Sequence, residues 1–335
     1  MALKGRSFIT TQDFPASDLE ALLSRAKNLK HAQEYPKTLA GKSIALLFFN
    51  ASMRTRVTME LAVTHLGGTA LTMNVGTDSW SLEHRDGVVM NEGKTEHIKD
   101  AAKVLSRYVD AIGVRCFPTM EKPEEDLADA VIMAFKRHSQ VPVINLESSL
   151  YHPCQALADM LTIQEKKGTV RGIKVVLTWA PHPKALPTAV PNSFLLAASQ
   201  LGADVILAHP KEFPLPGKIV EQAQGNAKAS GRLFRIVDNQ PEAFVGAQVV
   251  YAKSWGSIGY YGKWSEETKV RTNYGIWKID EPKLRSIQDA IFMHCLPIRR
   301  NVEATDAVLD SRQSVIYDEA ENRLWAQMAV LEALM

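Results

Sequence analysis

The stretch SIALLFFNASMRTR, residues 43–56, decides the fold of this chain. Residues 43–49 form a nearly continuous apolar run with the length of a strand that is buried on both faces. After this stretch, apolar residues recur at helical spacing, at Val57, Leu61, Ala62 and Leu66. A glycine pair at 67–68 ends the pattern. Residues 43–68 therefore predict a strand, a polar turn and a helix.

The turn between this strand and helix has the composition of an anion site. Backbone N–H groups at the start of a helix point toward an anion, and Ser52, Arg54 and Thr55 add two hydroxyls and a guanidinium at the same place. Arginine matches phosphate oxygens two at a time, so the turn predicts a phosphate cradle. Taken alone, the stretch is equally consistent with a serine helix cap followed by two solvated arginines.

The rest of the chain repeats the alternation of strands and helices. Strands are expected at 69–73, 111–114, 141–146, 173–178, 204–208, 234–237, 248–252 and 290–293, and helices at 18–31, 95–108, 124–138, 192–201, 219–230 and 319–334. Residues 74–93 form a long loop. This order predicts two doubly wound parallel α/β domains, residues 1–150 and 151–318, with the last helix (319–335) packed on the first domain.

Composition excludes several classes of protein. The 335 residues carry a net charge of +2, which lacks the basic excess of a nucleic-acid-binding surface. No apolar run approaches the ~20 residues that span a bilayer, and residues 1–6 precede no signal-peptide core. Three widely spaced cysteines fit neither a disulfide framework nor a zinc site, so we expect a cytoplasmic protein without metal or cofactor.

Polar residues follow the expected strands at their carboxyl ends, where ligands bind in open parallel sheets. Arg115 follows one strand, Glu147 and His152 another, and Lys253 and Cys295 the strands of the second domain. We expect the two domains to enclose a cleft with arginine on one wall. Each residue also has a structural interpretation: a surface charge, a core thiol or a hydrogen-bonded core histidine.

Three motifs together resemble the carbamoyltransferase superfamily over essentially the whole chain: Ser52-Met53-Arg54-Thr55-Arg56, His152-Pro153-Cys154-Gln155 and His294-Cys295-Leu296-Pro297. Within it, the chain is most similar to the N-acetylornithine and N-succinylornithine branches. The segments Phe48-Phe49-Asn50, Lys253-Ser254-Trp255-Gly256 and Arg299-Arg300-Asn301-Val302 carry this likeness. Ordinary ornithine carbamoyltransferases have a Ser-Met-Gly loop for a free α-amine where Lys253–Gly256 stands here.

The resemblance implies a role for each site residue. The residues that would bind carbamoyl phosphate are Ser52, Met53, Arg54, Thr55, Trp80, Arg115, His152, Gln155, Cys295, Leu296 and Arg323. Of these, Arg54, Thr55, Arg115 and His152 would be catalytic, with His152 orienting the carbonyl rather than acting as an obligatory base. Arg56 would brace the loop. The residues that would bind the acylated amino acid are Glu147, Lys253, Ser254, Thr95, Arg299 and Glu303.

Two positions depart from the acetylornithine branch. That branch has glutamate where this chain has Thr95, and the succinylornithine branch has proline; Thr95 is also a good residue to start a helix. Glu303 stands where acetylornithine enzymes have a lysine that can be carboxylated, and its carboxylate can replace that negative group. N-acetylornithine is the expected acceptor, with N-succinylornithine and then free ornithine as alternatives.

The resemblance further implies assembly and topology. Trp80 would reach the active site of a neighbouring subunit in a homotrimer, and the chain near Lys253 would pass through a knot formed by residues 181–191. The reaction would serve arginine biosynthesis, with no nucleic acid or membrane partner. A non-catalytic sensor of phosphate compounds is an alternative of a different class.

Overall fold

The computed structural model describes residues 3–287 and 289–335, and the chain forms two compact units. Unit 1 comprises Met1–Thr119, Glu124–Cys154 and Arg323–Met335, and unit 2 comprises Met120–Pro123 and Gln155–Asn322. The first two residues of the N-terminal segment, which was expected to lack a signal peptide, lie outside the described residues. Helices α6 (Pro153–Lys167) and α13 (Ile316–Leu334) run continuously across the boundary between the units.

Unit 1 is built on a parallel four-stranded sheet in the order β2-β1-β5-β6. The strands are β1 (Ser43–Phe48), β2 (Thr69–Asn74), β5 (Ala111–Arg115) and β6 (Val143–Glu147). Every residue of β5 and β6 is buried, which is why β5 reads as an apolar run up to Arg115 and β6 as an apolar run that Asn145 interrupts. The parallel α/β fold that the sequence predicts is confirmed.

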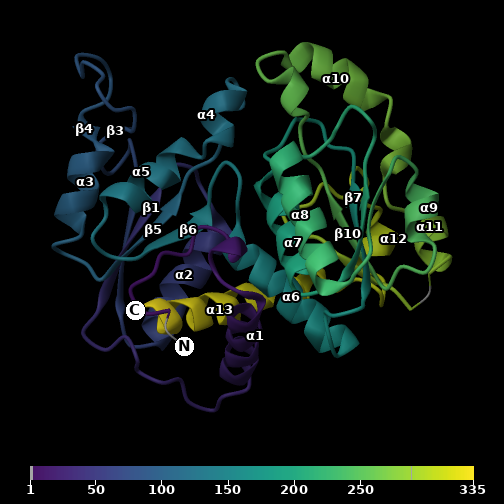
Figure 1. Cartoon of the computed structure of the whole chain (residues 1–335), viewed down its shortest axis with the longest axis horizontal. Coiled ribbons are helices and arrows are strands. Elements are labelled where there is room, and N and C mark those ends of the chain that lie inside the picture. Colours follow the sequence, from purple (N-terminus) through teal and green to yellow (C-terminus); the bar gives the residue numbers. More distant parts are fainter. Residues whose placement is uncertain (1–2, 288) are drawn as a thin grey trace. The chain divides into compact units, whose positions relative to one another are not determined.

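Unit 1 also contains several helices, some of which pack on its sheet (Figure 1). They are η1 (Thr11–Asp13), α1 (Ala16–Lys30), α2 (Met53–His65), α3 (Ile98–Leu105), α4 (Pro123–Leu127), α5 (Ala130–His138) and the end of α13. On α1 the predicted stripe of Leu19, Leu22, Leu23, Ala26 and Leu29 is buried, as expected for an amphipathic helix. The amide of Gly5 donates to the carbonyl oxygen of Leu334 at 2.9 Å, so both ends of the chain lie in unit 1.

The single helix predicted over residues 124–138 is wrong, because the chain breaks between α4 and α5 at Asp129. Asp129 has the left-handed conformation (φ +50°), which aspartate tolerates better than most residues. Its carboxylate is buried and accepts hydrogen bonds from the segment that follows β6. A continuous helix would not turn this carboxylate inward, so a tertiary contact overrides the local helical pattern.

The helix predicted to start at Thr95 starts instead at Ile98. His97 is the residue before the first turn, and its Nδ1 accepts a hydrogen bond from the amide of Lys99 at 3.0 Å. Thr95 lies before a short strand, β4 (Glu96–His97), which pairs in parallel with β3 (Leu82–Glu83). The loop expected over 74–93 therefore contains a strand, and Thr95 is not a helix cap.

Helix α2 buries only part of the apolar set that its spacing suggested, because Ala62 and Leu66 are buried but Val57 and Leu61 are not. Thr55, Met59, Ala62 and Val63 are buried, whereas Val57 and Leu61 are 49% and 41% exposed. The apolar residues of α2 thus lie on two faces of the helix. Among the described residues, only one of these faces is buried.

Unit 2 contains a parallel five-stranded sheet in the order β11-β10-β7-β8-β9. The strands are β7 (Lys174–Trp179), β8 (Asp204–Ala208), β9 (Phe234–Val237), β10 (Val249–Lys253) and β11 (Ile291–Met293). Its helices besides α6 are α7 (Ala189–Gln200), α8 (Gly217–Ser230), α9 (Gln240–Phe244), η2 (Ile258–Tyr260), α10 (Trp264–Thr272), η3 (Gly275–Trp277), α11 (Glu281–Arg285) and α12 (Asp306–Leu309). Helices α7 and α8 lie side by side (Figure 1).

Most elements of unit 2 agree with the sequence prediction. Helix α7 begins at Ala189, three residues before the predicted start, because Pro191 is accepted within the first turn of a helix. The short helices between β10 and β11 were not predicted. The predicted knot stays a prediction.

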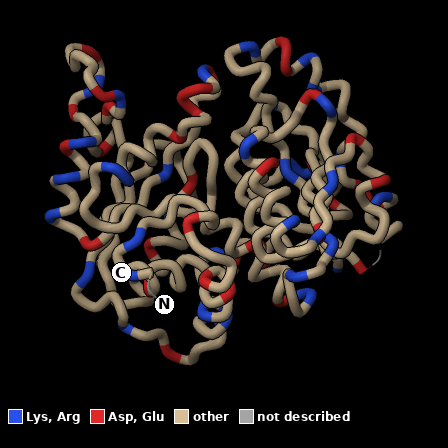
Figure 2. The backbone as a smooth tube through the Cα atoms, viewed as in Figure 1, with Lys and Arg blue, Asp and Glu red and all other residues tan. Residues whose placement is uncertain are grey.

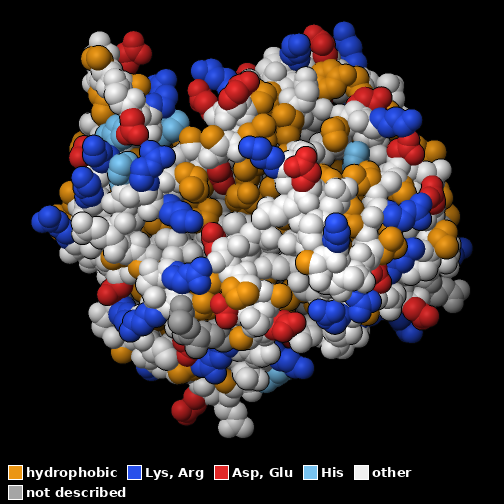
Figure 3. All heavy atoms as spheres, viewed as in Figure 1, with side chains coloured by type: hydrophobic (Ala, Val, Ile, Leu, Met, Phe, Trp, Pro, Cys, Tyr) orange, Lys and Arg blue, Asp and Glu red, His pale blue; other side chains and the backbone are white. Residues whose placement is uncertain are grey.

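Basic and acidic side chains are interspersed along both units (Figure 2), and both signs are mixed on the face shown in Figure 3. This distribution agrees with the net charge of +2. None of the described helices combines the length and the apolar character that a membrane crossing requires.

Candidate active site

The predicted phosphate cradle lies at the start of α2, directly after β1. Ser52 caps the helix by accepting a hydrogen bond from the amide of Thr55 at 3.2 Å. The first turn of α2 carries no acidic residue, so nothing in it opposes the positive end of the helix dipole. The Nε atom of Arg54 is buried and has no hydrogen-bond partner among the described residues. Ser52 and Arg54 therefore offer donors for an anion.

A second arginine reaches this cradle from the far end of the sequence. Arg323 of α13 is buried and donates from Nη2 to the hydroxyl oxygen of Thr55 at 2.7 Å. Arg56, the other arginine of the motif, pairs with Glu60 one turn later in α2 at 3.2 Å, and both side chains are half-buried. This contact lies within α2 and does not reach the turn, so a bracing role for Arg56 stays a prediction.

Arg115, Glu147 and His152 form a buried cluster at the carboxyl ends of β5 and β6. The Arg115 guanidinium is ion-paired with the Glu147 carboxylate and lies 4.5 Å from the centre of the Phe117 ring. The same carboxylate is 3.6 Å from Nε2 of His152. The three side chains are 7%, 9% and 2% exposed, so their charges interact with little screening by water.

The backbone at Glu147 is strained. Its φ of +152° is unusual for a residue with a side chain, and the pairing of β5 with β6 shifts register beside Arg115. Two hydrogen bonds hold this conformation: the Glu147 amide donates to Asn145 Oδ1 at 3.0 Å, and its carbonyl accepts from the Cys116 amide at 2.8 Å. Such strain concentrates at functional sites, where the surroundings impose it.

His152 is held in its neutral form. Burial lowers its pKa well below the ordinary value of 6.5, and the positive charges of Arg323 and Arg115 lower it further. A neutral imidazole can donate a hydrogen bond to a carbonyl oxygen, but it has no extra proton to give away near neutral pH. This state agrees with a role for His152 in orientation.

A buried polar network that the sequence did not reveal fixes the segment between Glu147 and His152. The Ser148 hydroxyl donates to Asp129 Oδ2 at 2.5 Å, and the Ser149 amide donates to Oδ1 at 3.0 Å. Asn145 Nδ2 donates to the Ser148 oxygen at 2.9 Å and to the carbonyl of Ile9 at 2.9 Å. The one signal in the sequence is the polar Asn145 inside an apolar strand.

Asp129 titrates near neutral pH because it is buried. Burial raises its pKa from 3.8 to about 6, against the lowering effect of the Ser148 hydroxyl and the amides of Ser149 and Leu150. The folded state thus favours the protonated carboxyl. Its contribution to stability is present below the unfolded pKa and is lost as pH rises through about 6.

We predict that Asp129→Asn removes this pH dependence. The free energy of unfolding of the natural chain should fall by about 3 kcal/mol relative to the variant as pH rises from about 4 to about 7.5. Denaturant unfolding at several pH values measures the difference, with Asp86→Asn, an exposed carboxylate of unit 1 paired with Arg137, as the control. A difference that does not change with pH would contradict the assignment.

Unit 2 contains a second buried cluster, centred on His294 and Glu303, which are both 0% exposed. Nε2 of His294 donates to Glu303 Oε1 at 3.3 Å, and its Nδ1 accepts from the Leu296 amide at 2.9 Å. These contacts assign the proton of the ring to Nε2. Leu296 is in the left-handed conformation (φ +55°), so the histidine fixes an unusual turn after β11.

Glu303 remains ionised despite its burial. Burial raises its pKa, but the hydrogen bond and electrostatic attraction of the His294 Nε2–H group, the charge of Lys253 and the Arg299 amide together lower it to about 2. The Arg299 amide donates to Glu303 Oε2 at 2.7 Å, while the Arg299 side chain is exposed. Lys253 is buried at the end of β10. The structure thus groups Lys253, Glu303 and the Arg299 backbone, but not the Arg299 guanidinium.

Gln155 and Cys295 lie in the buried interior of unit 2. Gln155 Nε2 donates to Asp159 at 2.8 Å and to Glu319 at 3.3 Å, and its Oε1 has no hydrogen-bond partner among the described residues. Cys295 forms no disulfide bond and is 5% exposed. The Gln155 carbonyl therefore remains available as an acceptor, as a carbamoyl amide would require.

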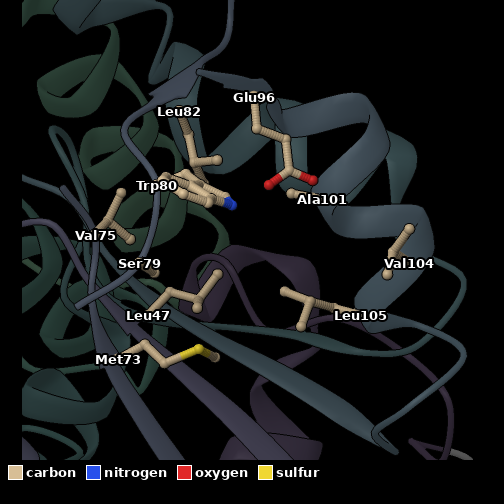
Figure 4. A pocket seen from close by; sticks show the side chains of 10 residues that line it. All are labelled: Leu47, Met73, Val75, Ser79, Trp80, Leu82, Glu96, Ala101, Val104 and Leu105. Atoms are coloured by element: carbon tan, nitrogen blue, oxygen red, sulfur yellow. The ribbon is translucent and has the colours of Figure 1, made fainter. Parts of the chain in front are cut away.

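Trp80 and Thr95 lie beside β3 and β4 of unit 1, not at the ends of β5 and β6. The Thr95 amide donates to the Ser81 carbonyl at 3.1 Å, so the two predicted ligands lie on adjoining loops. Trp80 is 64% exposed and lines an apolar pocket of about 210 Å³, with Glu96 facing it (Figure 4). No described hydrogen bond or ion pair joins them to Arg115 or His152. Met53 is likewise exposed, at 74%.

Within the part of the chain that the structure describes, no group of three or more His, Cys, Asp or Glu side chains is arranged to hold a metal ion. In unit 1 the predicted residues Thr55, Arg323, Arg115, Glu147 and His152 converge at the strand ends. In unit 2 the predicted residues Lys253 and Glu303 interact electrostatically, and His294, which was not among the predicted ligands, connects Glu303 to Leu296. Each unit therefore carries its own buried cluster of charged and polar side chains beside the carboxyl ends of its parallel strands, where open α/β sheets bind ligands.

Comparison with known proteins defines the class. Residues 6–165 match the family model of the aspartate/ornithine carbamoyltransferase carbamoyl-P binding domain, and residues 172–334 match the Asp/Orn binding domain of the same family. The chain therefore belongs to the aspartate/ornithine carbamoyltransferase family.

Comparison with individual full-length relatives shows which enzymes of the family the chain is similar to. The chain is 46% identical to the N-acetylornithine carbamoyltransferase of Xylella fastidiosa strain 9a5c, over 100% of the chain and 99% of the relative. It is 36% identical to the N-succinylornithine carbamoyltransferase of Bacteroides fragilis strain 638R, over 98% of each. A crystal structure of acetylornithine transcarbamylase complexed with acetylcitrulline superposes with a TM-score of 0.96 at 44% identity, covering 98% of this chain and 99% of that one.

Proposed function

We propose that this protein transfers the carbamoyl group of carbamoyl phosphate to the side-chain amine of N-acetylornithine, releasing N-acetylcitrulline and phosphate. The observation that carries the proposal is the buried convergence of Thr55, Arg323, Arg115 and His152 at the strand ends of a carbamoyl-P binding domain. Full-length identity to an N-acetylornithine enzyme supports the acceptor. The reaction would serve arginine biosynthesis in the cytoplasm.

Carbamoyl phosphate would bind first through its phosphate group. The start of α2 supplies backbone N–H groups and the Ser52 hydroxyl, and Arg54 and Arg323 supply positive charge. Charge-assisted hydrogen bonds from guanidinium to phosphate are about twice as strong as neutral ones, and the fork also fixes orientation. The carbamoyl group would then lie toward Arg115.

The carbonyl oxygen would be polarised by Arg115, the Thr55 hydroxyl and neutral His152. Negative charge develops on this oxygen as the amine attacks, and donors already in place stabilise it without rearrangement. Glu147 holds Arg115 before substrate arrives. The resemblance also gives Glu147 a contact with the amino acid, and this contact stays a prediction.

The attacking amine must lose its proton. An ordinary amine of this kind has a pKa of ~10.4, so deprotonation at pH 7 costs roughly 4–5 kcal/mol. The positive charges of Arg54, Arg115 and Arg323 disfavour a bound ammonium and lower that cost. As the new C–N bond forms and the C–O bond to phosphate breaks, the departing phosphate takes the amine proton, so the reaction requires no protein base.

The acylated amino acid would bind to unit 2 through Lys253 and the neighbouring segment. Glu303 supports this assignment, because its ionised carboxylate interacts electrostatically with Lys253. It supplies the negative charge that the carboxylated lysine would supply in the acetylornithine branch. Thr95 departs from the acetylornithine pattern, and its small side chain leaves room for a longer acyl group. N-succinylornithine is therefore the second candidate acceptor.

A comparison of acceptors tests the proposal. With carbamoyl phosphate in excess, we expect the purified protein to form the ureido product fastest from N-acetylornithine, more slowly from N-succinylornithine and least from ornithine. Colorimetric detection of the ureido group, together with phosphate release, measures all three. Phosphate release that needs no acceptor would contradict a transferase, and a faster rate with N-succinylornithine would reassign the acyl group.

Two neighbouring arginines give a matched test of the phosphate cradle. Arg54→Ala should weaken carbamoyl phosphate binding about 100-fold, since about 3 kcal/mol of charge-assisted hydrogen bonding is lost. Arg56→Ala, which removes a half-buried arginine paired with Glu60, should change affinity less than about twofold. Isothermal titration calorimetry measures both, with circular dichroism to verify folding. Equal affinities for the two variants would rule out the cradle.

We further propose that the protein works as a homotrimer in which Trp80 enters the site of the next subunit. The uncovered apolar side chains support an interface: Met53, Val57 and Leu61 on α2, Leu71 on β2, and Trp80 are 41–74% exposed. Together with the pocket beside Trp80, they belong to unit 1.

Subunit mixing tests shared sites. Arg54→Ala and Trp80→Ala proteins should each be nearly inactive, whereas trimers formed from an equal mixture should regain about a quarter of the wild-type sites. The regained sites take Arg54 from one subunit and Trp80 from the next. Activity after co-refolding is the measurement, and a mixture of Arg54→Ala with itself is the control. A mixture that stays inactive would contradict the shared site.

A further inference from the structure

The segment Lys253–Gly256 that follows β10 is fastened on several sides within unit 2. The Trp255 carbonyl accepts a hydrogen bond from Trp179 Nε1 at 3.0 Å, and the Trp255 indole donates to the Phe213 carbonyl at 2.8 Å. The Gly256 amide donates to the Leu186 carbonyl at 2.8 Å. The segment is therefore fixed both to the sheet and to the loop after β7.

The approach of this segment to the neighbouring loop requires glycine. A Cβ added to Gly256 would lie 2.9 Å from Cβ of Ala185 and 3.1 Å from Cε of Met120. A Cβ does not fit at the first of these distances without movement of the neighbour. The backbone of residue 256 is consequently pressed against the loop.

Arg271 of α10 completes the fastening from inside the unit. Nη1 donates to the Ser254 hydroxyl at 3.0 Å and Nη2 donates to the Trp255 carbonyl at 3.1 Å. Arg271 is only 3% exposed, so neither hydrogen bond competes with water. One planar fork thus spans two consecutive residues of the segment, which the single ammonium group of lysine cannot reproduce.

The guanidinium itself is oriented by three partners. Glu267, one helical turn earlier and 1% exposed, pairs with it through both carboxylate oxygens, and the bond from Nε measures 3.0 Å. The centres of the Trp179 and Phe213 rings lie 5.5 Å and 5.1 Å from the Arg271 Cζ. A buried arginine needs a partner charge. Here Glu267 accepts from Nε and Nη2, which leaves Nη1 and the second hydrogen of Nη2 for the segment.

We infer that Arg271 is a positioning residue for the acceptor substrate: it holds Lys253 and Ser254 in their binding conformation before the substrate arrives. The inference rests on the proposed function, in which this segment binds the acylated amino acid. Because the segment is already ordered, the acceptor binds without the loss of entropy that ordering a loop requires. The binding residues for carbamoyl phosphate on α2, β5 and α13 do not depend on Arg271.

Kinetics of Arg271→Lys test this role. We expect KM for N-acetylornithine to rise about tenfold, as the loss of buried charge-assisted hydrogen bonds produces, with KM for carbamoyl phosphate changed less than about twofold. Arg235→Lys is the control, because Arg235 of unit 2 forms an exposed ion pair with Glu242. Equal rises in both KM values, or a lower melting temperature with both KM values unchanged, would overturn the inference.

Hydrogen exchange gives a readout that needs no activity. In the free wild-type protein the Gly256 amide should exchange slowly, and in Arg271→Lys and in Ser254→Ala its exchange should accelerate about tenfold while amides in β8 stay protected. Ser254→Ala keeps the test decisive if the arginine variant folds poorly. Fast exchange of Gly256 in the wild type would refute the fastened segment. Absence of carbamoyl transfer in the wild type would instead refute the proposed function.

Discussion

The buried ion pair between Arg115 and Glu147 is the interaction on which unit 1 depends. An arginine placed at the end of a buried strand is stable only if a carboxylate neutralises it, and Glu147 does so from the adjacent strand. Glu147 in turn adopts a strained backbone that Asn145, Ser148 and Asp129 maintain through buried hydrogen bonds. These connected hydrogen bonds thus hold Glu147 in place, and Glu147 holds the charged Arg115 side chain at the end of the sheet.

In each unit, the surroundings of one buried ionisable residue fix its protonation state. In unit 1, burial keeps His152 neutral, and the positive charges of Arg323 and Arg115 add to this effect. In unit 2, a histidine and a lysine surround Glu303 and keep it ionised. Each environment selects one protonation state in advance, and this is how a site can bind and polarise a substrate without the rearrangement that water requires.

The sequence was sufficient for the sheets, since fully buried strands such as β5 read as apolar runs and the α1 stripe has helical spacing. It was also sufficient for the motif residues, which carry the family likeness. It was insufficient where a distant contact overrides a local pattern: the break at Asp129 depends on Ser148, and the inward arginine of α10 depends on Ser254. Apolar spacing also could not separate the core face of α2 from its exposed face, because both faces carry apolar residues.

The hydrogen bond between Arg323 and Thr55 joins residues separated by 268 positions. During synthesis on the ribosome, α2 therefore emerges long before the arginine that completes its anion site. All strands of unit 2 leave the ribosome in that interval, so unit 2 can form its sheet while unit 1 still lacks its last helix. The nascent chain cannot assemble the complete Arg323–Thr55 site until α13 has been translated.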